Sequence, residues 1–302
     1  MGAVVSSLVN MSSSTVADAL RATHEFLQQG PVRLLLRREW RSALPLHALL
    51  SGAPLERWGR VREHDLKGRG QVHVLTTSLG DLVAKRMSRG GIIGGLLRES
   101  YADPDRPLRE ALLAEQLIAA GCRTPAVAVA RATRRAPGSW RLELATVRVQ
   151  GARDLLDVLL ELQAQAADPG DLAERSGRSL AGLHGAGLHH RDLQVKNLLV
   201  EPGDGPLVVI DLDRCQLARP LPPASAREGL LRFLRSLAKH GLLPRAGADP
   251  EPRFAGALLQ GVLEGYGDLE RAGLDLPSLR TALARQLRFH APFWPRVARR
   301  SS

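Results

Sequence analysis

The stretch HHRDLQVKNLLV, residues 189–200, places Asp192 and Asn197 five positions apart and ends in a short apolar run. Two more carboxylates, Asp211 and Asp213, follow in LVVIDLDRC. A carboxylate can accept a proton from a hydroxyl, and carboxylate and amide oxygens are the ligands that Mg²⁺ prefers. Phosphoryl transfer to a hydroxyl needs these groups, because metal ions offset the phosphate charge and one carboxylate orients the nucleophile.

We therefore predict roles for five polar residues of the two stretches. Asp192 is the candidate general base, while Asn197 and Asp211 are the candidate Mg²⁺ ligands. Asp213 lies two residues beyond Asp211 and could reach a second metal ion, and Lys196 could contact a phosphate or the substrate. An acid-rich surface hairpin with accidental spacing is the alternative, but the complete order of the motif favours a catalytic site.

The elements that must hold these groups are also visible in the sequence. The apolar runs NLLV and PLVVI flank the turn EPGDGP, which predicts a β-hairpin with polar residues at its mouth. His190 and Arg191 are expected to support the loop before the hairpin. The Leu and Val side chains would then anchor the hairpin in the core and fix the position of the polar groups.

A candidate nucleotide-binding set precedes this motif. Gly68 and Gly70 form a short glycine turn, which lacks the full G-x-G-x-x-G pattern, and Lys85 follows in the β-like run DLVAKRM. In a kinase, a lysine so placed pairs with the nucleotide phosphates and with a glutamate on the next helix. Glu110 is the first candidate for that glutamate, but periodicity alone does not exclude Glu115.

The pattern along the chain predicts three regions. Residues 1–55 are expected to form a mainly helical N-terminal extension. Residues 56–149 contain a meander of three short strands, a helix over 107–121 with Pro at its start and Gly at its end, and two further strands. Residues 150–302 are expected to be mostly helical. The fold class is therefore α+β, in two lobes.

Bulk properties narrow the class of protein. The 302 residues are 44% hydrophobic and 24% charged, which is ordinary folded composition. The two cysteines form no CxxC pair, so neither a zinc site nor a disulfide framework is indicated. No apolar run is long enough for a membrane span, and no secretory signal is recognised. The net charge of +11 favours an anionic partner such as nucleic acid, an acidic lipid surface or a phosphorylated substrate.

Five motifs in order, RGGIIGGLL, REALLAEQLIAAGCRTPAV, VQGARDLLDVLL, LHGAGLHHRDLQVKNLLV and VVIDLDRCQL, resemble the lipopolysaccharide core kinases. The resemblance spans about residues 60–240 and is strongest to the 3-deoxy-D-manno-octulosonic acid (Kdo) kinase branch. It implies a protein-kinase-like fold, ATP and Mg²⁺ as cofactors, and a lipid-linked core sugar as acceptor. It also implies a peripheral location at the cytoplasmic face of the inner membrane.

Residue by residue, the resemblance implies that Lys85 and Glu110 serve the nucleotide, Asp192 the acceptor hydroxyl, and Asn197 and Asp211 the metal. The sequence HRD departs from the variant expected in many family members, and the first 55 residues have no counterpart there. No A-P-E sequence or long activation segment follows Asp213, which argues against a peptide substrate.

Three alternative hypotheses compete with this assignment. A kinase of the same fold could act on an aminoglycoside, an amino alcohol or another sugar. A non-catalytic pseudokinase scaffold is a second reading, against which the intact Lys85, Asp192, Asn197 and Asp211 weigh. Nucleic-acid binding is suggested by charge alone and is not expected, because no recognised binding motif accompanies it.

Overall fold

The computed structural model describes residues 13–62, 72–87, 100–244, 252–267, 269 and 275–290. Gly68, Gly70 and the RGGIIGGLL motif lie outside the described residues. The chain divides into two compact units. The sheet unit comprises Ser7–Ala119 and Pro125–Val149, and the helical unit comprises Met1–Ser6, Ala120–Thr124 and Gln150–Ser302.

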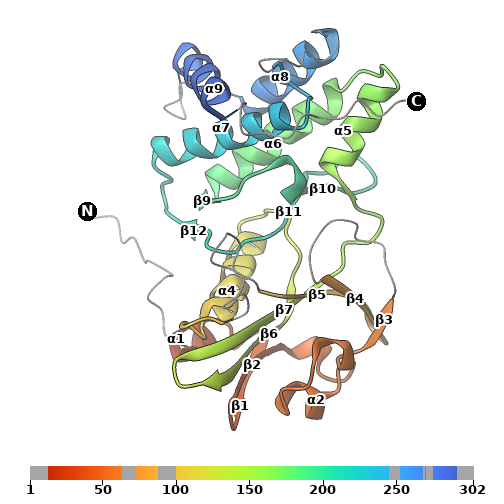
Figure 1. Ribbon diagram of the computed structural model, residues 1–302, viewed down its shortest axis with the longest axis vertical. Coiled ribbons are helices and arrows are strands. Elements are labelled where there is room, and N and C mark those ends of the chain that lie inside the picture. The colour runs from red at the N-terminus through yellow and green to blue at the C-terminus, as the bar shows by residue number, and fades with distance from the viewer. Residues whose placement is uncertain are drawn as a thin grey trace. The chain divides into compact units, whose positions relative to one another are not determined.

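A seven-stranded antiparallel sheet organises the sheet unit, in the order β1-β2-β6-β7-β5-β4-β3 (Figure 1). Its strands are β1 (His24–Gln29), β2 (Val32–Arg37), β3 (Arg60–Arg62), β4 (Val72–Thr77), β5 (Gly80–Arg86), β6 (Val127–Ala136) and β7 (Ser139–Val147). The predicted meander is confirmed, because β3, β4 and β5 pair in sequence order. The two later strands are confirmed as the pair β6 and β7.

Helix α4 (Arg106–Ala119) confirms the helix expected near residues 107–121 and packs against β6 and β7. Leu108, Leu113 and Leu117 on its inner face are almost fully buried. The other helical segments of this unit are α1 (Ser13–Ala19), η2 (Arg38–Trp40), α2 (Leu46–Leu50) and η3 (Leu55–Arg57).

The prediction of a mainly helical extension is wrong for residues 24–37, which form the β1–β2 hairpin. Strand β2 lies between β1 and β6, so Leu34, Leu35 and Leu36 are all fully buried. A strand covered on both faces has a continuous apolar run rather than alternation, and such a run cannot be told from a buried helix by periodicity. The chain reverses at Gly30, whose φ of 52° is left-handed.

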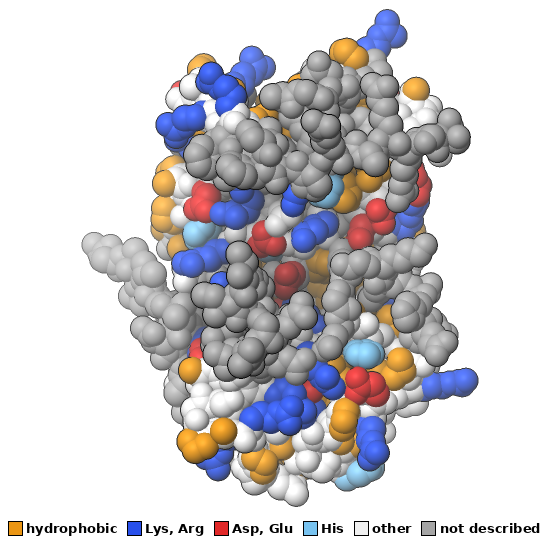
Figure 2. Space-filling model, viewed as in Figure 1, with side chains coloured by type: hydrophobic (Ala, Val, Ile, Leu, Met, Phe, Trp, Pro, Cys, Tyr) orange, Lys and Arg blue, Asp and Glu red, His pale blue; other side chains and the backbone are white. Residues whose placement is uncertain are grey.

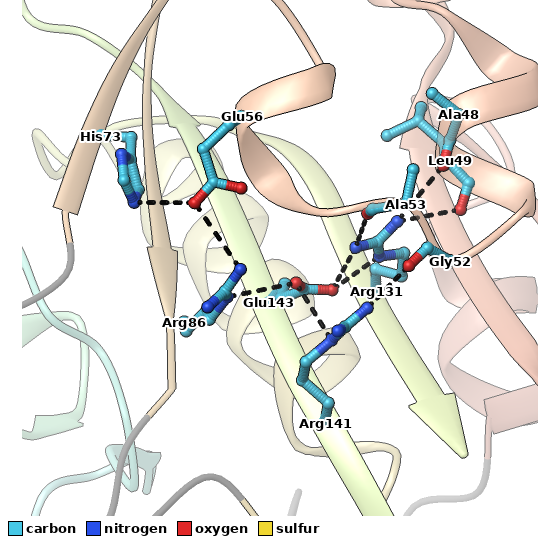
Figure 3. A network of polar contacts seen from close by, with 10 residues as sticks. All are labelled: Ala48, Leu49, Gly52, Ala53, Glu56, His73, Arg86, Arg131, Arg141 and Glu143. Atoms are coloured by element: carbon cyan, nitrogen blue, oxygen red, sulfur yellow. Dashed lines mark hydrogen bonds and ion pairs between the residues drawn. The ribbon is translucent and has the colours of Figure 1, made fainter. Parts of the chain in front are cut away.

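A buried polar network joins the segment before β3 to the sheet (Figure 3). Arg131 and Glu143 are fully buried and their side chains approach to 2.5 Å. The Arg131 guanidinium also donates to the backbone oxygens of Leu49 (3.1 Å) and Ala53 (2.6 Å). It lies 4.4 Å from the centroid of the Trp58 ring. Residues 48–58 are thus fixed to the sheet by one arginine side chain.

Among its described residues, the helical unit has five longer helices and several short strands (Figure 1). Its helices are α5 (Leu155–Ala164), α6 (Gly170–Gly185), α7 (Pro223–Lys239), α8 (Pro252–Tyr266) and α9 (Leu276–His290). Its strands and 3₁₀ turn are β8 (Arg153–Asp154), β9 (Leu188–His189), η4 (Val195–Asn197), β10 (Leu198–Val200), β11 (Val208–Val209) and β12 (Gln216–Leu217). The predicted hairpin is confirmed, since β10 pairs antiparallel with β11.

Helices α6 and α8 approach so closely that their contact requires glycine. A Cβ atom on Gly177 would lie 2.1 Å from the Val262 backbone oxygen, and one on Gly265 would lie 2.0 Å from the Glu174 backbone oxygen. At the end of the same contact, the buried His184 Nδ1 lies 2.7 Å from the Tyr266 hydroxyl. Burial lowers the pKa of His184 to about 4 and raises that of Tyr266 to about 12.

Among the helices that the structure describes, none has the length and apolarity needed to span a bilayer.

Candidate active site

Asp192 and Asn197 are joined directly across the loop that precedes β10. The Asn197 Nδ2 group donates to the Asp192 backbone oxygen at 2.7 Å and lies 3.3 Å from its Oδ2. Val195–Asn197 form the 3₁₀ turn η4, in which the Asn197 backbone N–H donates to the Gln194 carbonyl. With its Nδ2 committed to Asp192, the buried Asn197 amide has its Oδ1 left to act as a ligand.

His190 ties this loop to the residue before Asp211. The Asp192 backbone N–H donates to His190 Nδ1 at 3.1 Å, so the ring proton sits on Nε2, which donates to the Ile210 carbonyl at 3.2 Å. The Ile210 N–H in turn donates to the Asn197 backbone oxygen at 3.0 Å. These contacts and the Asn197–Asp192 bond close a ring of hydrogen bonds, which holds the loop and the start of the second acidic stretch together.

The buried His190 ring is held neutral by its surroundings. Burial lowers its pKa, while the hydrogen bond to the Ile210 carbonyl opposes that shift. A neutral ring suits the geometry, because Nδ1 must keep a lone pair to accept the Asp192 N–H. His190 thus supports the loop by accepting the Asp192 N–H and donating to the Ile210 carbonyl.

Asp211 leaves strand β11 in an unusual backbone conformation. Its φ of 62° is left-handed, which is uncommon for a residue other than glycine and better tolerated by Asp than by most residues. Such conformations persist where surrounding contacts impose them, and they cluster at functional sites. The clamped Ile210 immediately before it supplies that constraint, and the Asp211 side chain is exposed.

The other sequence-predicted residues of the helical unit lie close in sequence but differ in exposure. Asp213 is half-buried, whereas Lys196, within η4, is exposed. Among the described residues no group of three or more His, Cys, Asp and Glu side chains is arranged to hold a metal ion by itself. A Mg²⁺ ion here would need the amide oxygen of Asn197 and phosphate oxygens as further ligands, which is how Mg²⁺ is commonly bound beside nucleotides.

Two residues with clear contacts to this loop received no role from the sequence. The Gln194 side-chain amide donates to Asp192 Oδ1, so both oxygens of that carboxylate accept hydrogen bonds. Ser236 of α7 accepts the Val195 N–H at its Oγ (2.8 Å) and donates to the Phe233 carbonyl (2.9 Å). Gln194 could have been suspected from its place two residues after Asp192, whereas Ser236 carries no signal in the sequence.

In the sheet unit the structure brings Lys85 and Glu110 together. Lys85 Nζ on β5 lies 3.5 Å from Glu110 Oε1 on α4, and Glu110 is buried. Glu115 faces a different cation: its Oε1 is 2.5 Å from Arg37 Nη1 on β2. Periodicity left open which glutamate lies beside Lys85. In the structure it is Glu110, while Arg37, on strand β2 of the predicted N-terminal extension, pairs with Glu115.

A model of the family described as "Lipopolysaccharide kinase (Kdo/WaaP) family" matches residues 57–266. The chain belongs to this family. Membership makes this kinase a phosphotransferase that acts on a sugar hydroxyl, in the biosynthesis of lipopolysaccharide. The hairpin β1–β2 precedes the matched residues and α9 follows them.

Individual relatives and a solved structure agree with this placement. The kinase is 28% identical over 176 residues to a 3-deoxy-D-manno-octulosonic acid kinase of Vibrio parahaemolyticus, covering 57% of this chain and 71% of the relative. It is 34% identical over 190 residues to the protein of that name from Xanthomonas campestris pv. campestris, covering 61% and 73%. A structure of WaaP in complex with acyl carrier protein matches with a TM-score of 0.51 at 20% identity, covering 85% of this chain and 98% of the other. That structural likeness supports the kinase-like fold.

Proposed function

We propose that this protein transfers the γ-phosphoryl group of ATP to a hydroxyl of Kdo in a lipid-linked lipopolysaccharide core. The relatives named for 3-deoxy-D-manno-octulosonic acid support the sugar. The observation that carries the proposal is the ring of hydrogen bonds that joins Asp192 and Asn197 to Ile210, directly before Asp211.

In this proposal Asp192 is the general base. Gln194 and Asn197 each donate to one of its carboxylate oxygens. These two hydrogen bonds fix the orientation of the carboxylate toward the acceptor hydroxyl. The acceptor hydroxyl loses its proton to Asp192 as its oxygen bonds to the γ-phosphorus, and the bond from that phosphorus to the ADP oxygen breaks. The orientation of the base, rather than its proximity alone, is what these two amides contribute.

Asn197 Oδ1 and the carboxylates of Asp211 and Asp213 would hold Mg²⁺. When bound, the ion neutralises charge on the phosphates. Lys85, paired with Glu110, would contact the nucleotide phosphates, as would the glycines at 68 and 70, and Lys196 would contact a phosphate or the acceptor. A hard cation with oxygen ligands fits this donor set, which contains no sulfur.

Attachment to an anionic membrane surface is the further part of the proposal, and it would place the enzyme at the cytoplasmic face of the inner membrane beside its lipid-linked acceptor. Helix α9 exposes Arg280, Arg285 and Arg288, and Figure 2 shows Lys and Arg side chains gathered over this helix at the upper left of the view. Together with the net charge of +11, these side chains favour contact with acidic headgroups. Turnover on a lipid-linked acceptor should then fall as salt rises, while affinity for ATP changes less.

The acceptor is tested with a panel. The purified protein is incubated with ATP, Mg²⁺ and one acceptor at a time: a Kdo-bearing lipid, a heptose-bearing core, an aminoglycoside or an amino alcohol. The masses of the products are then measured by mass spectrometry. One added phosphate on the Kdo-bearing acceptor is expected. Phosphate on another core sugar alone would reject Kdo, and phosphate on the soluble amines alone would reject a core sugar altogether.

A further inference from the structure

Helix α7 runs along one side of the loop at residues 189–195, which carries the proposed base Asp192 and is called the catalytic loop below. Ser236 on α7 bonds to the Val195 N–H at 2.8 Å. Two turns earlier, Glu228 Oε2 lies 3.5 Å from His189 Nε2, just before the loop. Next to Glu228, a Cβ atom on Gly229 would be 3.4 Å from Leu193 Cδ2. The helix face that carries positions 228, 229 and 236 therefore runs beside residues 189–195.

Two arginines lie on this face between those anchors. Positions 228, 232, 235 and 236 follow the three- and four-residue spacing of one helix face, so Arg232 and Arg235 point to the side on which the catalytic loop lies. Both side chains are half-buried, whereas the three arginines of α9 are exposed. The α9 arginines therefore belong to a solvated basic surface, whereas Arg232 and Arg235 do not.

The positive charge of the pair is only partly balanced by the protein. Arg232 Nη2 bonds to Glu228 Oε1 at 2.8 Å, and its buried Nε has no hydrogen-bond partner among the described residues. Arg235 Nη1 bonds to the neutral Gln286 at 3.3 Å, and within the described part of the chain no carboxylate comes within ion-pair distance of it.

The electrostatics agree with this geometry. Burial lowers the pKa of Arg235, and the charge of Arg232 lowers it further, while Glu228 and Asp192 oppose the shift. Two like charges in a partly desolvated position repel each other, and an anion between them would relieve both the repulsion and the lost hydration. The influence of Asp192 on Arg235 also indicates that such an anion would bind near the proposed base.

We infer that Arg232 and Arg235 bind the carboxylate of the acceptor sugar and thereby select acidic sugars. The inference rests on the proposed function and deepens it, because 3-deoxy-D-manno-octulosonic acid carries a carboxyl group beside its hydroxyls. A guanidinium donates two parallel hydrogen bonds to a carboxylate, so the pair would both attract the sugar and turn one hydroxyl toward Asp192. The nucleotide phosphates are the other possible anion, and the test separates the two sources.

The test compares Arg235→Gln and Arg232→Gln with the wild type on two acceptors, the Kdo-bearing lipid and the same lipid with its Kdo carboxyl group as the methyl ester. For the free acid we expect the KM for the acceptor to rise at least about tenfold, with the KM for ATP unchanged. For the ester the variants and the wild type should be equally poor. Arg178→Gln, at an exposed arginine of α6 that pairs with Glu174, is the matched control and should leave the KM for both acceptors unchanged. Arg235→Lys should recover only part of the loss, since lysine keeps the positive charge but lacks the two parallel donors of the guanidinium.

Several distinct results would overturn the inference. A raised KM for ATP with an unchanged KM for the acid would assign the arginines to the nucleotide. An equal loss on acid and ester, or a lowered melting temperature that accounts for the loss, would make their role structural. Wild-type turnover of the free acid with unaffected variants would leave the proposed function standing and reject this inference alone, whereas absence of wild-type turnover on any core sugar would reject both.

Discussion

Asn197 holds Asp192 by two contacts from one amide group, 2.7 Å to its backbone oxygen and 3.3 Å to its Oδ2. Replacing Asn197 with Ala removes both contacts and the oxygen proposed for the metal. We expect kcat to fall about 100-fold or more, because the base loses its orientation and the phosphates lose a charge-neutralising ligand. Steady-state kinetics measure the loss, and circular dichroism checks the fold.

An amide whose hydrogen bond lies outside the loop provides the control for that experiment. Gln163 Nε2 donates to the Gly241 carbonyl at 3.1 Å. Gln163→Ala should keep near wild-type kcat. An equal loss in both variants would show that the effect of Asn197→Ala comes from general destabilisation.

Glu110 and Glu115 lie on the same helix but pair with different cations, which makes them a matched pair for mutation. Glu110→Gln should raise the KM for ATP and lower kcat by at least about tenfold, because Lys85 loses the partner that orients it. Glu115→Gln weakens the contact to Arg37 and should change activity only a few-fold. Kinetics at varied ATP concentration decide between them, and a larger effect at Glu115 would reject the assignment.

The buried His184 predicts a stability loss in acid. Its pKa is about 4 in the folded protein because of burial, against an ordinary value near 6.5 when unfolded. Since the unfolded chain binds the proton first, this group adds full stability above about pH 6.5 and loses it as the pH falls toward 4, by roughly 3 kcal/mol. Urea unfolding between pH 7 and 4 measures the slope. His184→Gln should unfold with a shallower pH dependence over that interval, and an unchanged slope would contradict the assignment.

Glu143 is the fully buried carboxylate that faces three arginines of the sheet, Arg131 at 2.5 Å, Arg141 at 3.2 Å and Arg86 at 3.8 Å. Glu143→Ala leaves those charges without their shared partner, so we expect a loss of about 3–5 kcal/mol in the free energy of unfolding. Chemical denaturation followed by circular dichroism measures it.

An exposed ion pair supplies the comparison for Glu143. Glu174 pairs with Arg178 one turn away on the surface of α6, where solvent and salt screen the interaction. Glu174→Ala should therefore have little effect on unfolding. If the two substitutions cost the same, the buried network does not contribute in the way its geometry indicates.

The parts of the site that could be predicted are those encoded locally. The motif from Asp192 to Asn197 and the hairpin after it lie within one short stretch, so spacing and turn residues were sufficient to predict them. The strand of Lys85 and the helix of Glu110 likewise carry their own periodicity, although the pairing of Glu110 rather than Glu115 with Lys85 did not follow from it.

The parts that could not be predicted depend on contacts between distant segments. Arg37 engages Glu115 from 78 positions away, and Ser236 supports Val195 from 41 positions away. The strand that carries Arg37 was itself predicted as helical, because its leucines are buried on both faces and show no alternation. A local sequence pattern shows neither which distant residue a side chain will contact nor whether a segment will be buried on both faces.

The central claim is that Asp192 directs phosphoryl transfer to the core sugar, and the most direct test is Asp192→Asn. Kdo-bearing lipid acceptor is incubated with ATP, Mg²⁺ and either protein, its mass is measured over time, and ATP binding is measured in parallel. We predict that the wild type adds one phosphate, while Asp192→Asn binds ATP with similar affinity and transfers phosphate at least about 100-fold more slowly. Transfer by Asp192→Asn at the wild-type rate would contradict the account.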